Sequence, residues 1–294
     1  MIIVTGVTGF IGSHLSPLIK KEYRNEEIFF LNELKFDLVT GKNLDIIPQN
    51  PRLIIHLAAA TDTSKSDQKC NNIGTKNLLK HLSKIGPKTH FIFTSSQAIF
   101  SDRRDCQKPI DQNTKPVSNN RYGKTKLEAE KILLSAAKKQ KFKLTIIRLP
   151  TVWGENPRKN SFLNFLKDLV GENSLISRLN WPGKVGLINV ETAAKFILNS
   201  SLSAPKNPKI ISVASQNLTL AEIFEKITIA KGKKYNQIRL PDFVWSIAKF
   251  LRPYLKYFES IMPANIYNYF WRASIVVDSP LRCKENIRGR GFTS

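Results

Sequence analysis

Tyr122 and Lys126 stand four residues apart in the stretch RYGKTKLEAE. This spacing places both side chains on one face of a helix. A phenol, with an ordinary pKa of about 10, is a poor base at neutral pH, but a neighbouring ammonium lowers that pKa and favours the phenolate. The pair could therefore donate and accept a proton. Tyrosine and lysine at this spacing are also common on protein surfaces, so the pair alone does not establish a catalytic site.

A second candidate site lies at 5–12, where TGVTGFIG directly follows the apolar run at 2–4. A phosphate-binding turn between a strand and a helix needs glycine for chain reversal, for close approach to pyrophosphate and for helix-on-strand packing. Gly6, Gly9 and Gly12 could fill these roles. The next helix would offer free N–H groups and the positive end of its dipole to phosphates. An ordinary glycine turn is the alternative, but the flanking strand and helix favour dinucleotide binding.

The elements that must position these residues alternate along the first half of the chain. Apolar runs predict strands at 2–4, 27–31, 53–57, 90–94 and 143–148, and helical patterns lie near 12–22, 72–84 and 121–139. This alternation predicts an α/β fold, a Rossmann-type doubly wound parallel sheet with helices on both faces.

The second half has a different pattern, which predicts a smaller, mainly helical C-terminal substrate lobe. Strand candidates become sparse, at 186–190 and 210–213, and prolines cluster between 205 and 263. We therefore predict a dinucleotide-binding domain over 1–170, to which 186–213 returns, and a substrate-binding lobe over 171–294.

The charge of the chain is strongly basic, with 46 Lys and Arg residues, 23 Asp and Glu residues and a net charge of +23. Such a field attracts polyanions: nucleic acid, an anionic membrane or a diphosphate-bearing substrate. A lysine-rich solvated surface is the plainer interpretation.

The cysteine content and the hydropathy of the chain indicate the cellular compartment in which the protein is expected. Cys70, Cys106 and Cys283 are widely separated, so we predict no disulfide framework and no metal site, and a reducing compartment. No apolar stretch approaches the roughly 20 residues of a spanning helix, and the early first strand leaves no room for a signal peptide. We therefore expect a cytoplasmic protein.

The glycine pattern resembles the TGxxGxxG turn of the extended short-chain dehydrogenase/reductase family, in its branch of NAD-dependent nucleotide-sugar epimerases and dehydratases. Six further stretches resemble motifs of this family in the expected order, over roughly residues 1–230. They are HLAAATD (56–62), NNIGTKNLL (71–79), FIFTSSQAIF (91–100), RYGKTKLEAE (121–130), IIRLPTVWG (146–154) and LINVETAAKFIL (187–198).

The resemblance implies reversible hydride transfer between a nicotinamide and a secondary alcohol carbon. Tyr122 would move the matching proton, Lys126 would also hold the nicotinamide ribose, and Ser96 would hydrogen-bond the reacting oxygen. Ser95 would be a packed hydroxyl at the end of a strand. Asn72 would take the family's structural asparagine position, and residues 148–150 would close the nicotinamide pocket.

The resemblance also implies a set of cofactor-binding residues. These are Gly6, Thr8, Gly9, Phe10, Ile11, Gly12, Asn32, Asp37, Leu38, Leu57, Ala58, Ala59, Asn72, Tyr122, Lys126 and Pro150.

The choice of cofactor depends on the region after the second strand. An acidic residue about 20 positions beyond the last glycine favours NAD, because it binds the adenosine ribose. Asn32 occupies this region, with Glu33 beside it and Lys35 close by. NAD and NADP therefore both stay open, with NAD slightly preferred. Asp37 would meet the adenine amino group or belong to an exposed turn.

Gln97 and Ala98 narrow the reaction class. In the 4,6-dehydratases of the family that this chain resembles, the residues at these two positions are Asp-Glu, because elimination of water requires a second acid and a second base. An epimerase or a reductase of a nucleotide sugar remains. A non-catalytic RNA-binding protein of the same fold is the alternative, and the intact set of Ser96, Tyr122 and Lys126 favours the enzyme over it.

The second half supplies the candidate contacts to substrate and partners. A diphosphate could be gripped by Arg158, Lys159, Arg178 or Lys184. The aromatic and basic segment 243–271 could be a helical cap on the lobe, or an element that rests on anionic lipid and serves a lipid-linked sugar. A homodimer could form through Leu127, Ile132, Leu133 and Leu134, which could equally belong to the core. The final segment, 274–294, departs from the family pattern because the helix that normally follows is missing.

Overall fold

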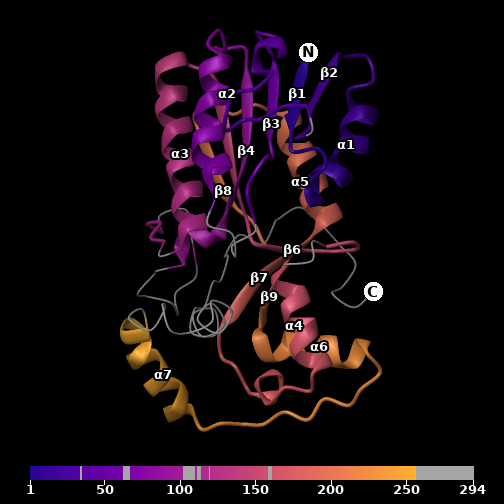
Figure 1. Cartoon of the computed structure of the whole chain (residues 1–294), viewed down its shortest axis with the longest axis vertical. Helices are drawn as coiled ribbons and strands as arrows, with labels where there is room; N and C mark the ends of the chain where they lie inside the picture. Colours follow the sequence, from indigo (N-terminus) through magenta and orange to yellow (C-terminus); the bar gives the residue numbers. More distant parts are fainter. Residues whose placement is uncertain are drawn as a thin grey trace.

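The computed structural model describes residues 1–33, 35–61, 67–101, 110, 114–118, 120–157 and 161–255. Six strands of this part form one parallel sheet, at the upper end of the molecule in Figure 1, in the order β2-β1-β3-β4-β5-β8. They are β1 (Ile2–Thr5), β2 (Ile28–Leu31), β3 (Leu53–His56), β4 (His90–Ser96), β5 (Lys143–Leu149) and β8 (Lys209–Ser212). The chain starts in β1, next to one edge, adds β2 at that edge and then builds the rest of the sheet on the other side of β1. This is the doubly wound topology, and it confirms the predicted fold class.

Helices cover both faces of this sheet (Figure 1). Within the apolar core, α1 (Phe10–Glu22) and α5 (Val190–Leu202) pack on one face, and α2 (Thr75–His81) and α3 (Arg121–Gln140) pack on the other. Successive residues of a strand point to opposite faces, so Ile2 and Val4 join the first cluster and Ile3 the second. The strands are apolar on both sides because both sides are covered.

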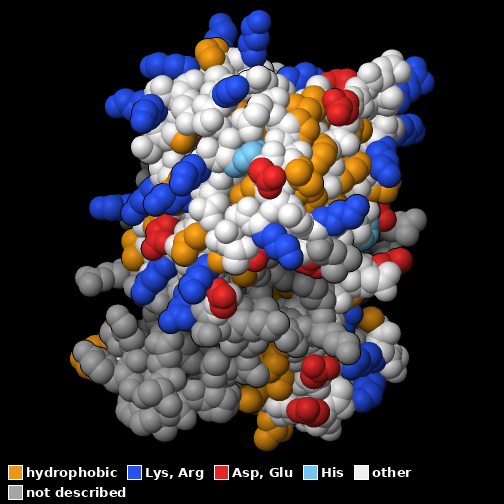
Figure 2. Space-filling view, turned by 45° about the horizontal axis from the view of Figure 1, so that its top comes forward, with side chains coloured by type: hydrophobic (Ala, Val, Ile, Leu, Met, Phe, Trp, Pro, Cys, Tyr) orange, Lys and Arg blue, Asp and Glu red, His pale blue; other side chains and the backbone are white. Residues whose placement is uncertain are grey.

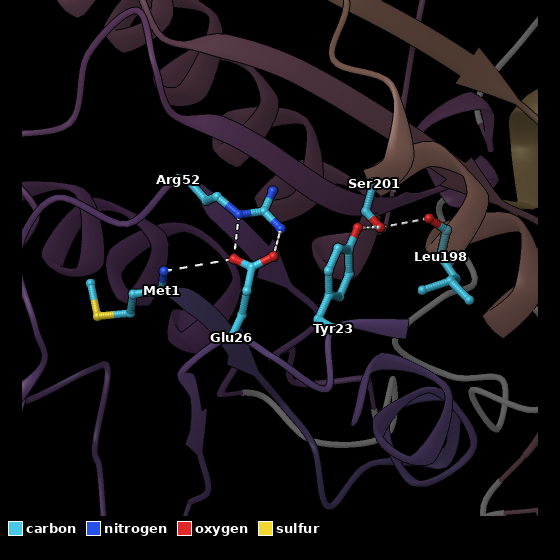
Figure 3. A network of polar contacts seen from close by, with 6 residues as sticks. All are labelled: Met1, Tyr23, Glu26, Arg52, Leu198 and Ser201. Carbon is cyan, nitrogen blue, oxygen red and sulfur yellow. Dashed lines mark hydrogen bonds and ion pairs between the residues drawn. The ribbon is translucent and has the colours of Figure 1, made fainter. Parts of the chain in front are cut away.

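Polar contacts connect neighbouring elements of the Rossmann domain (Figure 3). Ser201 donates to the Leu198 carbonyl, so the Tyr23 hydroxyl, 2.7 Å from Ser201, is the donor in that pair and joins α1 to α5. Glu26 forms an ion pair with Arg52 and lies 3.8 Å from the N-terminal amine of Met1. The start of β1 is thereby held beside the chain that enters β3.

Short helices connect the larger elements. They are η1 (Leu44–Ile46), the π-helix η2 (Cys70–Gly74), η3 (Gln97–Phe100) and η4 (Leu175–Arg178). The helix predicted over 72–84 is therefore a π-helical turn followed by the short α2, and Leu82 and Ile85 pack in the core beyond its end.

The second lobe has its own sheet and its own core. Its strands, in the order β6-β7-β9, are β6 (Thr151–Trp153), β7 (Lys184–Asn189) and β9 (Gln216–Thr219), and its helices are α4 (Phe162–Gly171), α6 (Leu220–Ala230) and α7 (Asp242–Leu255). The first two strands are parallel, and β9 runs antiparallel to β7. Leu166, Leu187 and Phe224 lie at the centre of its apolar cluster.

Strand β6 belongs to the second sheet. Trp153 and helix α4 pack in the apolar cluster of the second lobe, whereas Val152 packs against the cluster of the large sheet. The domain boundary at residue 170 stays a prediction. Strand β7 pairs with β6 and β9 and not with the large sheet, whereas α5 and β8 do return to that sheet. A continuous apolar strand gives no sign of which sheet it will join, because pairing involves residues far apart in the chain.

The four residues proposed for a dimer all contact the core. Leu133 is fully buried, Ile132 and Leu134 pack against the same cluster, and Leu127 packs beside Ile99 and Phe100. Dimerisation stays a prediction.

Candidate active site

The glycine turn lies at the carboxyl end of β1, and its geometry excludes larger residues. Gly6 has a φ of +72°, and a Cβ atom there would lie 2.6 Å from the Ala58 nitrogen. A Cβ atom on Gly12 would lie 2.7 Å from the Cα of Val7, so α1 packs directly on the turn. Only glycine permits both the left-handed conformation and this close packing.

The start of α1 is suited to bind an anion. Gly9 is its N-cap residue, so no side chain caps the helix, and the first turn carries no acidic residue. Thr8 and Gly9 are exposed, and Phe10 and Ile11 are half-buried. The terminal N–H groups and the positive end of the helix dipole are therefore available to a pyrophosphate. These features fit a dinucleotide, which is the group predicted for this turn.

A buried histidine connects the turn to β3 and η2. His56 lies with Nδ1 2.7 Å from the Thr5 hydroxyl and Nε2 3.0 Å from the Thr75 hydroxyl. Thr75 donates its proton to the Asn71 carbonyl, so it accepts from Nε2–H of His56. Thr5 accepts from the Ala58 N–H, so its own proton goes to Nδ1. The chain of hydrogen bonds is complete with a neutral ring.

Burial, together with the charge of Lys126, lowers the pKa of His56 to about 3. The ring therefore stays neutral at physiological pH and holds the end of β3 in place. Leu57, Ala58 and Ala59 follow directly and are half-buried. This puts three predicted cofactor contacts beside the glycine turn. The sequence contained His56 within a motif, but nothing in it indicated this role.

Of the two adjacent asparagines, the structure buries Asn71 and not Asn72, to which the structural position was assigned. The Asn71 side chain is fully buried and its amide donates to the Ala60 carbonyl and to the Thr125 hydroxyl of α3. Asn72 is half-buried and donates to Glu128. Adjacent residues of a helix point in different directions, so a shift of one position moves the side chain from the core to the surface.

The predicted adenosine end follows β2. Asn32 is half-buried and accepts a hydrogen bond from the Lys35 N–H. Asp37 caps its own turn, where hydrogen bonds from the Thr40 hydroxyl and from backbone N–H groups lower its pKa. Leu38 is buried against Gly74. Asp37 is thus a turn residue that keeps a partly exposed carboxylate.

The start of α3 is packed tightly against the chain that follows β4. A Cβ atom on Gly123 would lie 2.9 Å from the carbonyl carbon of Ala98, so glycine permits this approach. Asn120 caps the helix by accepting from the Gly123 N–H. Tyr122, which is half-buried, is thereby held at the same end of the sheet as Ser96. Sequence analysis did not identify Gly123, although it lies inside the quoted motif.

Lys126 is 1% exposed, and its ammonium donates to the Thr94 carbonyl at 2.9 Å. The ammonium also lies 4.7 Å from the centre of the Phe93 ring. Burial lowers the pKa of Lys126 to about 8, while Cys70 and Glu130 act in the opposite direction. A buried ammonium without a carboxylate bonded to it costs free energy, which is typical of a functional residue.

The two adjacent serines differ in burial. Ser95 is buried, and its hydroxyl has no partner among the described residues. Ser96 is half-buried and accepts from the Ala98 N–H, which leaves its own proton available to donate. The geometry therefore favours Ser96 as the hydroxyl that could reach a substrate.

Arg148, one of the residues 148–150 that were predicted to close the nicotinamide pocket, is buried. Its guanidinium donates two hydrogen bonds to Glu130 and lies 5.2 Å from the centre of the Phe100 ring. Pro150 is half-buried and lies beside Gly186.

The candidate diphosphate contacts are only partly described. Arg178 donates to the Asn236 carbonyl, and Lys184 is exposed at the start of β7. Arg158 and Lys159 lie outside the described residues.

A family model described as the NAD dependent epimerase/dehydratase family matches residues 2–172, more than half of the chain. The chain belongs to this family. Membership confirms the predicted enzyme class and the predicted class of nicotinamide cofactor.

Individual relatives differ in their reactions. A GDP-6-deoxy-D-mannose reductase of Pseudomonas aeruginosa is 30% identical over 45% of this chain and 45% of its own length. A UDP-glucose 4-epimerase of Vibrio cholerae is 25% identical over 84% of this chain and 80% of its own length. The structure titled "MoeE5 in complex with UDP-glucose and NAD" has a TM-score of 0.65 and 18% identity, and the match covers 81% of this chain and 84% of that one. This last likeness shows the fold.

Proposed function

We propose that this protein transfers hydride reversibly at a secondary alcohol carbon of a nucleotide sugar, as an epimerase or as a reductase of the keto sugar. One observation carries the proposal. The Lys126 ammonium is buried one helical turn from Tyr122, at the point where α3 packs against the backbone after Ser96. Burial of an ammonium there costs free energy, whereas proton transfer by a tyrosine benefits from it.

The residues have separate roles in this proposal. The Tyr122 hydroxyl moves the proton of the reacting alcohol, and the Lys126 ammonium favours the phenolate form. Ser96 donates its hydroxyl proton to the reacting oxygen and orients it. The glycine turn and the start of α1 hold a pyrophosphate. When bound, the nicotinamide dinucleotide supplies the hydride chemistry.

The surroundings of Ser96 support these reactions over elimination. Gln97 is buried, and its side-chain amide donates a hydrogen bond to the Val213 carbonyl. Ala98 has no titratable group. Neither residue can serve as the second acid or base that removal of water requires.

The cofactor is proposed to be NAD, with NADP retained as the alternative. Asn32 is uncharged and half-buried, and Glu33 beside it is exposed. An exposed carboxylate at this end disfavours the 2′-phosphate of NADP. Thermal shifts of the purified protein with NAD, NADH, NADP and NADPH at equal concentration test this choice, because the ligand that binds the folded protein more tightly raises the melting temperature more.

The activity is tested by a screen of nucleotide sugars, in which both sugar isomers and reduced nicotinamide are followed. An epimerase interconverts isomers without net consumption of the cofactor, and a reductase oxidises it stoichiometrically. We expect Tyr122→Phe to lower kcat by roughly 10²- to 10⁴-fold. Tyr23→Phe also removes one buried phenol oxygen, and it should leave kcat unchanged. Equal activity of Tyr122→Phe and the wild type would exclude the proposed mechanism.

A further inference from the structure

Helix α7 carries an exposed apolar stripe, which we define as Phe243, Ile247, Phe250, Leu251 and Tyr254. Their exposed fractions lie between 45% and 72%. These residues recur at intervals of four, seven, eight and eleven, and at about 100° per residue they occupy an arc of roughly 100° of the helix surface. An amphipathic helix normally turns such a face toward the core. Here it faces solvent.

Trp245 attaches α7 to the lobe on the side opposite to the stripe. Its ring lies 4.8 Å from the Trp181 ring, centre to centre, and Val244 and Ala248, between Trp245 and the stripe, are half-buried. Trp245 is about 170° from the middle of the stripe by the same helical geometry. The helix is therefore anchored by one side and presents the other outward, at the end of the molecule away from the large sheet (Figure 1).

The charge around α7 matches an anionic surface. Between residues 231 and 256 the chain carries seven Lys and Arg residues and a single acid, Asp242. Lys233, Lys234 and Arg239 are exposed in the segment that leads into the helix. Lys and Arg side chains also spread over the visible face of the Rossmann domain, with few acidic side chains among them (Figure 2).

We propose that α7 lies in the surface of an anionic lipid bilayer, with the stripe inserted among the lipids and the protein held by its positive field. A basic helix with aromatic and aliphatic residues on one face binds membranes in this way. Among the described residues, no helix has the length and apolar character that crossing a bilayer requires. The inference does not depend on the proposed activity, and it would place the enzyme where lipid-linked sugars are found.

The test is co-sedimentation of the full chain with vesicles of phosphatidylcholine containing 30% phosphatidylserine, against phosphatidylcholine alone. We expect binding to the anionic vesicles only. The triple variant Phe243→Ser/Ile247→Ser/Phe250→Ser should lose at least tenfold in affinity. The control Ile46→Ser/Leu202→Ser also replaces exposed aliphatic residues, but on the Rossmann domain, and should bind like the wild type.

A second variant keeps the proposal testable if the first does not fold. Lys233→Glu/Lys234→Glu changes only exposed side chains, and each charge removed near an anionic surface should cost about fivefold in affinity. Absence of binding by the wild type, or equal binding by the triple variant and the control, would overturn the proposal. A wild-type dimer that the triple variant converts to a monomer would also overturn it, because the stripe would then be a protein interface.

Discussion

We expect Lys126→Met to stabilise the fold while it removes activity. Lys126 is fully buried, and among the described residues its ammonium donates one hydrogen bond, to the Thr94 carbonyl, and lies beside the Phe93 ring. Methionine has a similar length and volume, so the substitution removes the charge without leaving a large cavity. A residue retained against the stability of the fold is expected at a functional site.

The magnitude follows from the pKa of Lys126, which burial lowers from 10.5 to about 8. Each pH unit corresponds to about 1.36 kcal/mol, so the buried charge costs about 3 kcal/mol below pH 8. The variant also loses the hydrogen bond to the Thr94 carbonyl, which reduces this gain by about 1 kcal/mol. We therefore expect a net gain of about 2 kcal/mol in the free energy of unfolding at pH 7.

The sign of the pH dependence is also determined. Between pH 8 and pH 10.5 the unfolded chain holds a proton on Lys126 that the folded chain has released, so wild-type stability rises with pH in this window. Lys126→Met lacks this contribution. The advantage of the variant over the wild type should therefore shrink by about 3 kcal/mol from pH 7 to pH 10.5.

Urea denaturation of the cofactor-free protein at several values between pH 7 and pH 10.5 measures both effects. Lys124→Met is the control, because it removes an exposed ammonium from the preceding part of the same helix and should change stability by less than about 0.5 kcal/mol. A stability difference between wild type and Lys126→Met that is constant across this pH range would refute the reasoning.

Three further predictions use other buried groups. The pKa of His56 is lowered to about 3, so between pH 6.5 and pH 3 the unfolded chain binds a proton that the folded chain does not. From pH 7 to pH 3 the wild type should therefore lose up to about 5 kcal/mol in the free energy of unfolding relative to His56→Gln, as measured by urea denaturation. Glu130→Gln should cost about 3–5 kcal/mol in the free energy of unfolding, because it leaves the Arg148 charge buried and unpaired. The double variant Glu130→Leu/Arg148→Met should restore most of this loss. A double variant whose loss equals the sum of the losses of the two single variants would contradict this. Gly123→Ala should lower turnover about 100-fold or more, because it displaces the start of α3. In the control Gly86→Ala, the Cβ atom would lie 3.7 Å from the Gln140 carbonyl oxygen, an ordinary contact, and turnover and melting temperature should be unchanged.

Local signals in the sequence predicted most of the Rossmann domain. Strands at 2–4, 90–94 and 143–148 correspond to β1, β4 and β5, because an apolar run between turn residues has few alternatives. The glycine turn was predictable for the same reason, since a chain reversal with φ of +72° at Gly6 depends on the residue itself and its neighbours.

Contacts between distant residues were not predictable in this way. The position of Asn71 in the core, 54 residues from its partner Thr125, decides which of two adjacent asparagines braces the site. Arg148, which was predicted to help close the nicotinamide pocket, forms an ion pair with Glu130 of another element, and no local pattern indicated this partner. Segment 243–271 was predicted to be a helical cap on the lobe or an element that rests on anionic lipid, and the pattern alone did not decide which side of the helix is exposed; its residues 256–271 lie outside the described part of the chain.

The sequence by itself determined the fold class, the glycine turn and the placement of Tyr122 and Lys126 on one helix, because strand patterns, turns and the helical repeat act over a few residues. Only the tertiary structure decided which strands joined the second sheet and that the Lys126 ammonium would be buried. Those outcomes depend on what packs against a residue from elsewhere in the chain, and burial changes the free energy of a charge far more than its sequence neighbours do.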